Sequence, residues 1–232
     1  MPSNRSKWTH DVNLTILLVL LGVLLFLPLP GLRNSTARLF TELGLTGILI
    51  SACATVQRPR RLLHVAVLLT AASVILGWVE FFHPNAMLAK WNLGLSVVVL
   101  VLISVVVSIW VLGPGQITGH RIRGAVLVYL LLGLTWALGY ALVELVVPGS
   151  FALAEHIAID VAALDRQALM RELIYYSFVT LTTVGYGDIT PLSEAGRQLA
   201  MLEALCGQLF PVVFIGRMVS LEISDSTEKS AD

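Results

Sequence analysis

The sequence predicts an all-α membrane protein with six transmembrane helices and a short re-entrant helix and loop between the fifth and the sixth. Of the 232 residues, 56% are hydrophobic and 13% are charged, and the mean hydropathy is +0.84. This composition is far more apolar than that of a soluble domain. Apolar stretches of the length needed to cross a bilayer, about 20 residues, recur along the chain. A glycine-rich string interrupts the pattern before the last of them.

Six apolar stretches are the expected transmembrane helices. They cover 12–29, 37–57, 62–82, 91–112, 122–147 and about 195–221. The first stretch follows Arg5 and Lys7, as a signal peptide would, but it is longer than a usual signal core and has no small-residue cleavage pattern. We expect three regions: a four-helix N-terminal membrane domain at 1–115, a second membrane domain at 116–221 and a short cytoplasmic tail at 222–232.

Lysine and arginine residues set the expected orientation. With six crossings, nine of them fall on the side of the two termini and six on the other side, and the short loop Arg58–Arg61 is the clearest anchor. We therefore expect a multi-pass protein of the plasma membrane with both termini cytoplasmic, in contact with membrane lipid. The formal net charge is zero, so no nucleic-acid partner is expected.

The segment between the fifth and sixth stretches does not resemble an ordinary loop. Residues 148–170 are polar enough for an extracellular loop, and a short helix is expected at about 171–182, which is too short to span the bilayer. A helix that enters the membrane and returns as irregular chain is tolerated only when it is buried in protein or lines water. Its C-terminus would direct the negative end of its dipole toward a cation. The alternative is an amphipathic surface helix.

The string Thr183–Asp188 has the residues needed to point successive carbonyl oxygens toward one axis. A regular strand cannot do this because its carbonyls alternate. Gly185 and Gly187 can take positive φ without steric cost, so they can alternate with Val184 and Tyr186, whose side chains then point away into packing. The Thr183 hydroxyl would lie at the inner end and the Asp188 carboxylate at the outer mouth.

This string resembles the selectivity filter of the potassium channel family, and residues 173–191 resemble its pore helix and filter. The similarity to the two-helix pore of that family covers roughly 122–221. It implies a K⁺-selective ion channel in which carbonyls of Thr183, Val184, Gly185 and Tyr186 bind K⁺, with no organic cofactor. A regulatory or non-conducting channel-like subunit and a weakly selective cation channel are the alternatives.

The same resemblance assigns residues that support the filter. Tyr175 and Tyr176 take the positions of the aromatic residues that brace the filter, where the family more often has tryptophan. Val179 stands where a well-studied bacterial proton-gated channel has a glutamate paired with the filter aspartate, so Asp188 needs another partner or solvent. Thr182 completes this support set.

One filter string per chain has a consequence for assembly. Four loops are needed to surround an ion, and neither the string nor its flanking helices recur in the 232 residues. We expect a homotetramer with the pore on the fourfold axis.

The sixth stretch is expected to line the inner pore. Gly207 and Pro211 weaken the helix near its middle, so gating by bending is expected. By the resemblance, Gly207 falls at the hinge position of the family, and the alternative is that it only allows close helix packing. Gln208, Pro211 and Ile215 share a helical face that we assign to the cavity. Glu203 is a candidate buried carboxylate that supports the pore helix, or else a carboxyl near the outer water.

The N-terminal region lacks the usual voltage sensor. Residues 91–119 contain no lysine or arginine, so no row of charges can move in the field, and opening is expected to depend weakly on voltage. Glu42, Glu80 and Glu144 lie near outer segment ends. They are expected at the surface, with a role as proton-sensitive groups as the alternative.

No sequence pattern indicates an enzyme. The chain has no phosphate-binding loop, nucleophile elbow or catalytic triad pattern, and its five histidines show no metal-ligand spacing. Cys53 and Cys206 are expected as reduced packing residues.

Overall fold

The computed structural model describes residues 15, 18–19, 21–22, 43–44, 46–49, 60–83, 85–113, 119–153 and 166–229. Its elements are α3 (Arg60–Phe82), α4 (Ala86–Leu112), α5 (Gly119–Val146), β1 (Phe151–Ala152), α6 (Arg166–Leu181), β2 (Thr190–Pro191) and α7 (Glu194–Lys229). The first two predicted stretches, 12–29 and 37–57, lie mostly outside the described residues, and so do Glu42 and Cys53.

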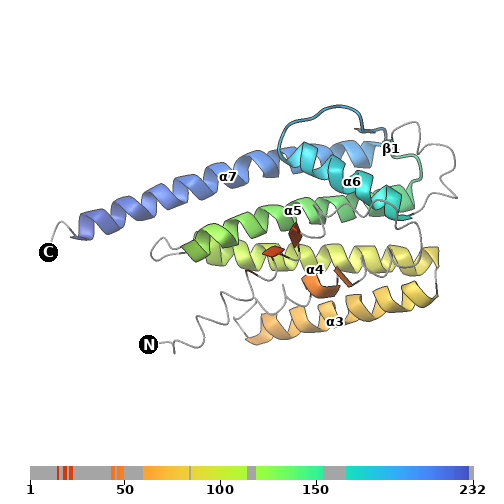
Figure 1. Ribbon diagram of the computed structural model, residues 1–232, viewed down its shortest axis with the longest axis horizontal. Coiled ribbons are helices and arrows are strands. Elements are labelled where there is room, and N and C mark those ends of the chain that lie inside the picture. The colour runs from red at the N-terminus through yellow and green to blue at the C-terminus, as the bar shows by residue number, and fades with distance from the viewer. Residues whose placement is uncertain are drawn as a thin grey trace.

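Helices α3, α4, α5 and α7 lie side by side, and α6 packs near one end of α5 and α7 (Figure 1). These four side-by-side helices are each long and apolar enough to cross a membrane. The segments concerned are His64–Phe82, Ala86–Leu112, Arg121–Val146 and Glu194–Ile223. The chain is therefore an all-α membrane protein. Two short antiparallel strands accompany the helices, with Phe151 opposite Pro191 and Ala152 opposite Thr190.

Polar contacts join α3 to α4. Asn85 caps α4 by accepting a hydrogen bond from the Met87 amide at 2.8 Å. Between the helices, the Ser73 and Ser96 hydroxyls are 2.9 Å apart, and Asn92 donates to the Glu80 carboxyl at 2.9 Å. Glu80 is 4% exposed, so the prediction of a surface position for it was wrong. The sequence does not show that the side-chain amide of Asn92 lies close enough to donate a hydrogen bond to this buried carboxyl.

Much of the described core lies between α4 and α5. Ile103 and Val107 of α4 pack with Leu127 and Leu131 of α5, and all four are buried. At the end of α4, Arg121 donates to the Gly113 carbonyl at 2.8 Å and Arg217 of α7 donates to the Leu112 carbonyl at 3.0 Å. Carbonyls at a helix end have no partner within the helix, so these guanidinium groups satisfy them and tie three helices together.

Helix α6 starts earlier than predicted. The sequence indicated a helix from about 171, whereas α6 begins at Arg166. Residues 166–170 read Arg-Gln-Ala-Leu-Met, all good helix formers. Because their polarity is mixed, the sequence pattern did not indicate that the helix begins here. Helix α7 runs without interruption through Pro211 to Lys229, beyond the predicted end at 221.

Candidate functional site

The loop after α6 has positive φ at alternate positions. Thr183, Gly185 and Gly187 have φ of 61°, 57° and 79°, while Val184 and Tyr186 between them do not have positive φ. The two glycines take the conformation that the sequence predicted. The positive φ of Thr183 was not predicted from the sequence, because a β-branched residue rarely has positive φ. Positive φ at alternate residues is the backbone pattern that we associated with carbonyl oxygens pointing toward one axis.

The inner end of the loop is hydrogen-bonded to the last turn of α6. The Val179 carbonyl accepts from the amides of Val184 at 3.0 Å and Gly185 at 3.2 Å. The Thr182 hydroxyl donates to the Phe178 carbonyl at 2.6 Å. Val179 and Thr182, two of the predicted support residues, therefore take part in hydrogen bonds at the helix end, where carbonyls lack partners within the helix.

Helix α7 reaches the inner end of the same loop. Gln208 donates its side-chain amide to the Thr183 hydroxyl oxygen at 3.1 Å, and that hydroxyl donates to the Thr182 carbonyl at 2.7 Å. Gln208 and Ile215 are exposed and Pro211 is half-buried. Glu203 and Gly207 of the same helix are buried, so α7 turns one side to the rest of the chain and leaves Gln208 and Ile215 on the other.

At the outer end of the loop, Tyr175 is the partner of Asp188. The Tyr175 hydroxyl donates to one carboxylate oxygen at 2.7 Å, and the Ile189 amide donates to the other at 3.1 Å. The tyrosine hydrogen bond is the main cause that holds the pKa of Asp188 below its ordinary value, and it raises the pKa of Tyr175 to about 12. Tyr176 has a different position: it is buried and packs edge-on against Tyr140 and Phe151.

We expect Tyr175→Phe to raise the pKa of Asp188 toward the ordinary aspartate value of about 3.9. A carboxyl whose pKa is lower in the folded protein stabilises the folded loop at pH values above its ordinary pKa. That stabilisation is lost as the pH falls through the lower native pKa. The variant should lose this pH-dependent part. Carbon NMR titration of the Asp188 carboxyl measures it, with Tyr176→Phe as the control. An unchanged titration in Tyr175→Phe would show that the tyrosine hydroxyl does not lower the pKa of Asp188.

Two glycines allow neighbouring helices to approach α6 closely. A Cβ on Gly207 of α7 would lie 2.0 Å from the Leu181 carbonyl oxygen, and a Cβ on Gly133 of α5 would lie 2.5 Å from Cζ of Phe178. The Tyr129 hydroxyl donates to the same Leu181 carbonyl at 3.1 Å. The close-packing role of Gly207 is thus visible in the structure, whereas bending at Gly207 stays a prediction.

A polar cluster lies behind α6, among otherwise apolar helices. Glu203 is fully buried, and its two carboxyl oxygens contact the hydroxyls of Tyr140 and Ser177. The Ser177 hydroxyl also lies 2.7 Å from the Gly133 carbonyl oxygen. Sequence reasoning singled out Glu203 but missed Tyr140 and Ser177. Their polarity within membrane helices was the available signal, because such groups need partners there.

The chain that follows α5 is fixed by a carboxyl of that helix. Glu144 accepts from the amides of Gly149 at 2.7 Å and Phe151 at 3.1 Å, and is 5% exposed. The prediction of a surface position for Glu144 was therefore wrong. The sequence could not show that the chain folds back on this carboxyl at the end of α5. The turn positions β1 to pair with β2 directly after Ile189.

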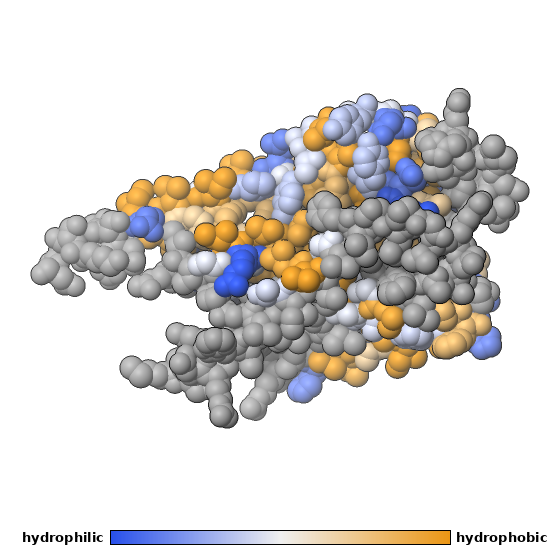
Figure 2. Space-filling view, viewed as in Figure 1, coloured by the Kyte–Doolittle hydropathy of each residue, from blue (hydrophilic) through white to orange (hydrophobic). Residues whose placement is uncertain are grey.

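Much of the loop and of α7 is exposed in the single chain. Residues 182–188 are all exposed, with Val184 at 52% and Tyr186 at 71%. The packing predicted for these two side chains is not made within one chain. Figure 2 shows hydrophobic surface along α7, to which Leu205, Leu209 and Val212 contribute. Apolar surface of this extent on a helix requires lipid or protein to cover it.

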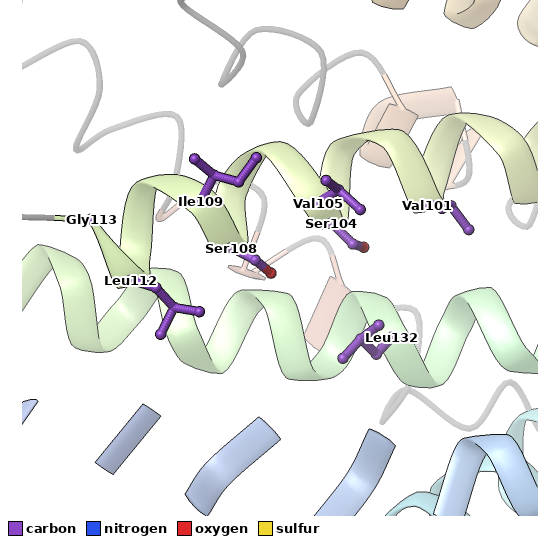
Figure 3. A pocket seen from close by; sticks show the side chains of 8 residues that line it. All are labelled: Val101, Ser104, Val105, Ser108, Ile109, Leu112, Gly113 and Leu132. Carbon is purple, nitrogen blue, oxygen red and sulfur yellow. The ribbon is translucent and has the colours of Figure 1, made fainter. Parts of the chain in front are cut away.

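A groove of about 420 Å³ lies elsewhere, between α4 and α5 (Figure 3). Val105, Ile109 and Leu112 of α4 and Leu132 of α5 form much of its apolar wall, and Ser104 and Ser108 also line it. None of the predicted site residues lines this groove, so it is separate from the loop after α6.

The comparisons with known proteins agree with this geometry. A sequence model of the ion channel family matches residues 160–223, which contain α6, the loop and most of α7. Protein LctB of Bacillus caldotenax is 32% identical over 125 residues, which is 54% of this chain and 92% of LctB. The chain therefore belongs to the ion channel family, and LctB is a relative that it covers almost end to end.

Two further relatives extend the comparison. Protein LctB of Geobacillus stearothermophilus is 31% identical over 128 residues and is covered to 92% of its length. The inward rectifier potassium channel Kirbac3.1 of Paramagnetospirillum magnetotacticum is 34% identical over 82 residues, which is 34% of this chain and 28% of that channel.

Proposed function

We propose that the protein is a K⁺-selective ion channel whose filter is Thr183–Asp188. The observation that carries this proposal is the alternation of positive φ at Thr183, Gly185 and Gly187, directly after a helix that ends at Leu181. In this proposal the carbonyls of Thr183 to Tyr186 point to one side, where they can replace the hydration shell of K⁺. The similarity to a potassium channel over 82 residues supports the same transported ion.

The inner end of the filter has a role in this proposal. The C-terminus of α6 brings the negative end of its dipole to the filter, which favours a cation there. Gln208 contacts Thr183 from α7 and belongs to the face that we assign to the cavity, together with Pro211 and Ile215. Inner helices that bend at Gly207 or Pro211 would open and close this cavity.

We infer a homotetramer with lipid on its outer surface. One chain supplies one filter, and the exposed side chains of Val184 and Tyr186 need neighbours to pack against. Three further copies around a fourfold axis would provide these neighbours and would also cover apolar residues of α7. In the intact protein, we place the filter toward the outside of the plasma membrane and both termini in the cytoplasm, with six crossings per chain.

The N-terminal helices are not a voltage sensor of the usual kind in this proposal. Helix α4 carries only Lys90, near its start, and no basic residue follows within it. Each elementary charge that crosses 100 mV contributes about 2.3 kcal/mol, so steep gating needs several such charges. Opening is therefore controlled by a stimulus other than a moving row of arginines. We also propose that the protein has no enzymatic activity.

The assembly can be measured directly. We expect the full chain, purified in mild detergent, to have the mass of four copies after subtraction of bound detergent. Light scattering combined with refractive index and absorbance gives that mass. A monomer or dimer that still passes K⁺ selectively would contradict the inference, because one or two loops cannot surround an ion.

Liposome flux tests the function. Vesicles loaded with K⁺ and holding the purified protein should accumulate tracer Rb⁺ from a K⁺-free medium, and vesicles loaded with Na⁺ should not accumulate tracer Na⁺ in the same way. Rb⁺ accumulation that Ba²⁺ blocks supports a filter, since Ba²⁺ has nearly the size of K⁺ and twice its charge. Equal uptake of Rb⁺ and Na⁺ would favour the weakly selective channel.

A regulatory or non-conducting subunit is the second candidate. The observation that favours it is that LctB, which the chain covers to 92%, has a name that states no transport. Under this alternative, the liposomes would show no flux although the protein forms a stable oligomer. The two functions therefore differ in a single assay.

A further inference from the structure

We propose that Glu203 is a neutral carboxylic acid whose proton completes a hydrogen-bond chain across α5, α6 and α7 and positions the pore helix. The consequence for conduction rests on the proposed channel function, whereas the protonation state does not. Three side chains and one carbonyl form the chain: Tyr140, Glu203, Ser177 and the Gly133 carbonyl.

Counting hydrogens assigns the proton. The Ser177 hydroxyl has one hydrogen, yet its oxygen lies within hydrogen-bond distance of two oxygens, Oε1 of Glu203 at 2.5 Å and the Gly133 carbonyl at 2.7 Å. A carbonyl and a carboxylate both only accept. If Glu203 were ionised, one of these contacts would place lone pairs against lone pairs.

A carboxylic acid removes this conflict. Its O–H donates to the Ser177 oxygen, and Ser177 donates to the Gly133 carbonyl. Tyr140 donates to the other carboxyl oxygen of Glu203. Every hydrogen in the chain then has an acceptor, and no two acceptors face each other.

The surroundings of Glu203 favour the neutral form. The carboxyl is fully buried, and in the described part of the chain it forms no ion pair. The titratable groups that face it are Tyr129 and Tyr140 from α5, Tyr176 from α6 and Cys206 from its own helix. All four are ordinarily neutral at pH 7, so none of them offsets a negative charge. An unpaired carboxylate within a membrane helix is costly.

The position of the chain explains what the proton does. Ser177 lies in α6, and the chain joins it to α5 on one side and to α7 on the other. Glu203 lies one helical turn before Gly207, which contacts the end of α6 at Leu181. The proton therefore holds the C-terminal half of α6, the pore helix, while Gly207 accommodates its end. Without the proton, Ser177 can satisfy only one of its two partners, and the pore helix loses one attachment.

Substitution of Glu203 by glutamine and by alanine distinguishes a neutral acid from a carboxylate at this position. A glutamine amide can donate to Ser177 and its oxygen can accept from Tyr140, as the neutral acid does. We expect Glu203→Gln to keep Rb⁺ flux within roughly twofold of the wild type and Glu203→Ala to lose roughly tenfold or more, as expected when a buried hydrogen bond is removed. Ser177→Ala should resemble Glu203→Ala. If Glu203→Gln fails as badly as Glu203→Ala, the proposal is wrong.

A pH series adds a readout that packing alone would not change. As the pH rises, wild-type flux should change when Glu203 loses its proton, and Glu203→Gln should not show this change. Glu194→Gln is the matched control, because Glu194 is exposed at the start of the same helix. An identical alkaline response in wild type and Glu203→Gln would overturn the proposal.

Infrared spectroscopy tests the proton without conduction. In the purified full chain at neutral pH, the difference spectrum of wild type minus Glu203→Gln should contain a carboxylic acid C=O stretching band. The difference spectrum with Glu194→Gln should contain carboxylate bands only. Absence of the acid band would refute the neutral form. An acid band in a protein that passes no ions would refute the channel function and leave the assignment of the proton supported.

Discussion

Gly207→Ala is expected to eliminate K⁺ flux and to lower the thermal stability of the assembled protein. The new Cβ would lie 2.0 Å from the Leu181 carbonyl oxygen and 2.8 Å from its carbon. These are backbone atoms at the end of α6, so no side-chain rotation can relieve the clash. Excess atoms in packed interiors cost about 1–3 kcal/mol when side chains can adjust, and we expect a larger cost here. The filter starts two residues later, at Thr183, and would move with Leu181.

Gly216→Ala is the matched control for this effect. Gly216 lies in the same helix, and a Cβ there would meet nothing within 4 Å in the single chain. Alanine is also the better helix former by about 1 kcal/mol, so this variant should assemble and conduct. Flux and unfolding temperature of the two variants are compared in liposomes and detergent. A Gly207→Ala protein of normal stability with altered opening would instead support the hinge interpretation.

Gly185→Ala is expected to abolish selective conduction for a different reason. A Cβ at Gly185 would meet nothing within 4 Å in the single chain, so space is not the limit. Its φ of 57° is the limit, because a left-handed conformation costs an alanine roughly 1–2 kcal/mol. In a tetramer this strain would act four times on one ring of carbonyls. We expect loss of flux, or flux without preference for K⁺ over Na⁺.

Gly149→Ala separates strain from filter function. Gly149 has a φ of 81° and also meets nothing within 4 Å, but it lies in the turn after α5. The same strain there should lower stability and leave selectivity unchanged. If Gly149→Ala and Gly185→Ala changed selectivity equally, positive φ in the filter would not explain selection.

The elements that depend on local sequence could be predicted. Hydropathy alone located α3, α4, α5 and α7, because membrane helices must be both long and apolar. The glycines at 185 and 187 indicated positive φ, since that conformation strains other residues. The start of α6 was missed because helix formers of mixed polarity resemble a polar loop.

The contacts between helices could not be predicted in this way. Glu80 and Glu144 were expected at the surface, yet each has donors that the fold supplies, Asn92 for one and two backbone amides for the other. The pairing of Tyr175 with Asp188 likewise depends on how α6 lies against the loop that follows it. Such pairs depend on distances in space, and a single sequence shows only distances along the chain.

The reversal potential under bi-ionic conditions tests the central proposal most directly. The purified full chain is placed in a planar bilayer with K⁺ on one side and Na⁺ on the other at equal concentration. The account predicts a reversal potential far from zero, with the sign of a K⁺-selective pore, and its loss in Gly185→Ala. A reversal potential near zero in the wild-type protein would contradict the account, because Thr183–Asp188 would then not act as a K⁺ filter.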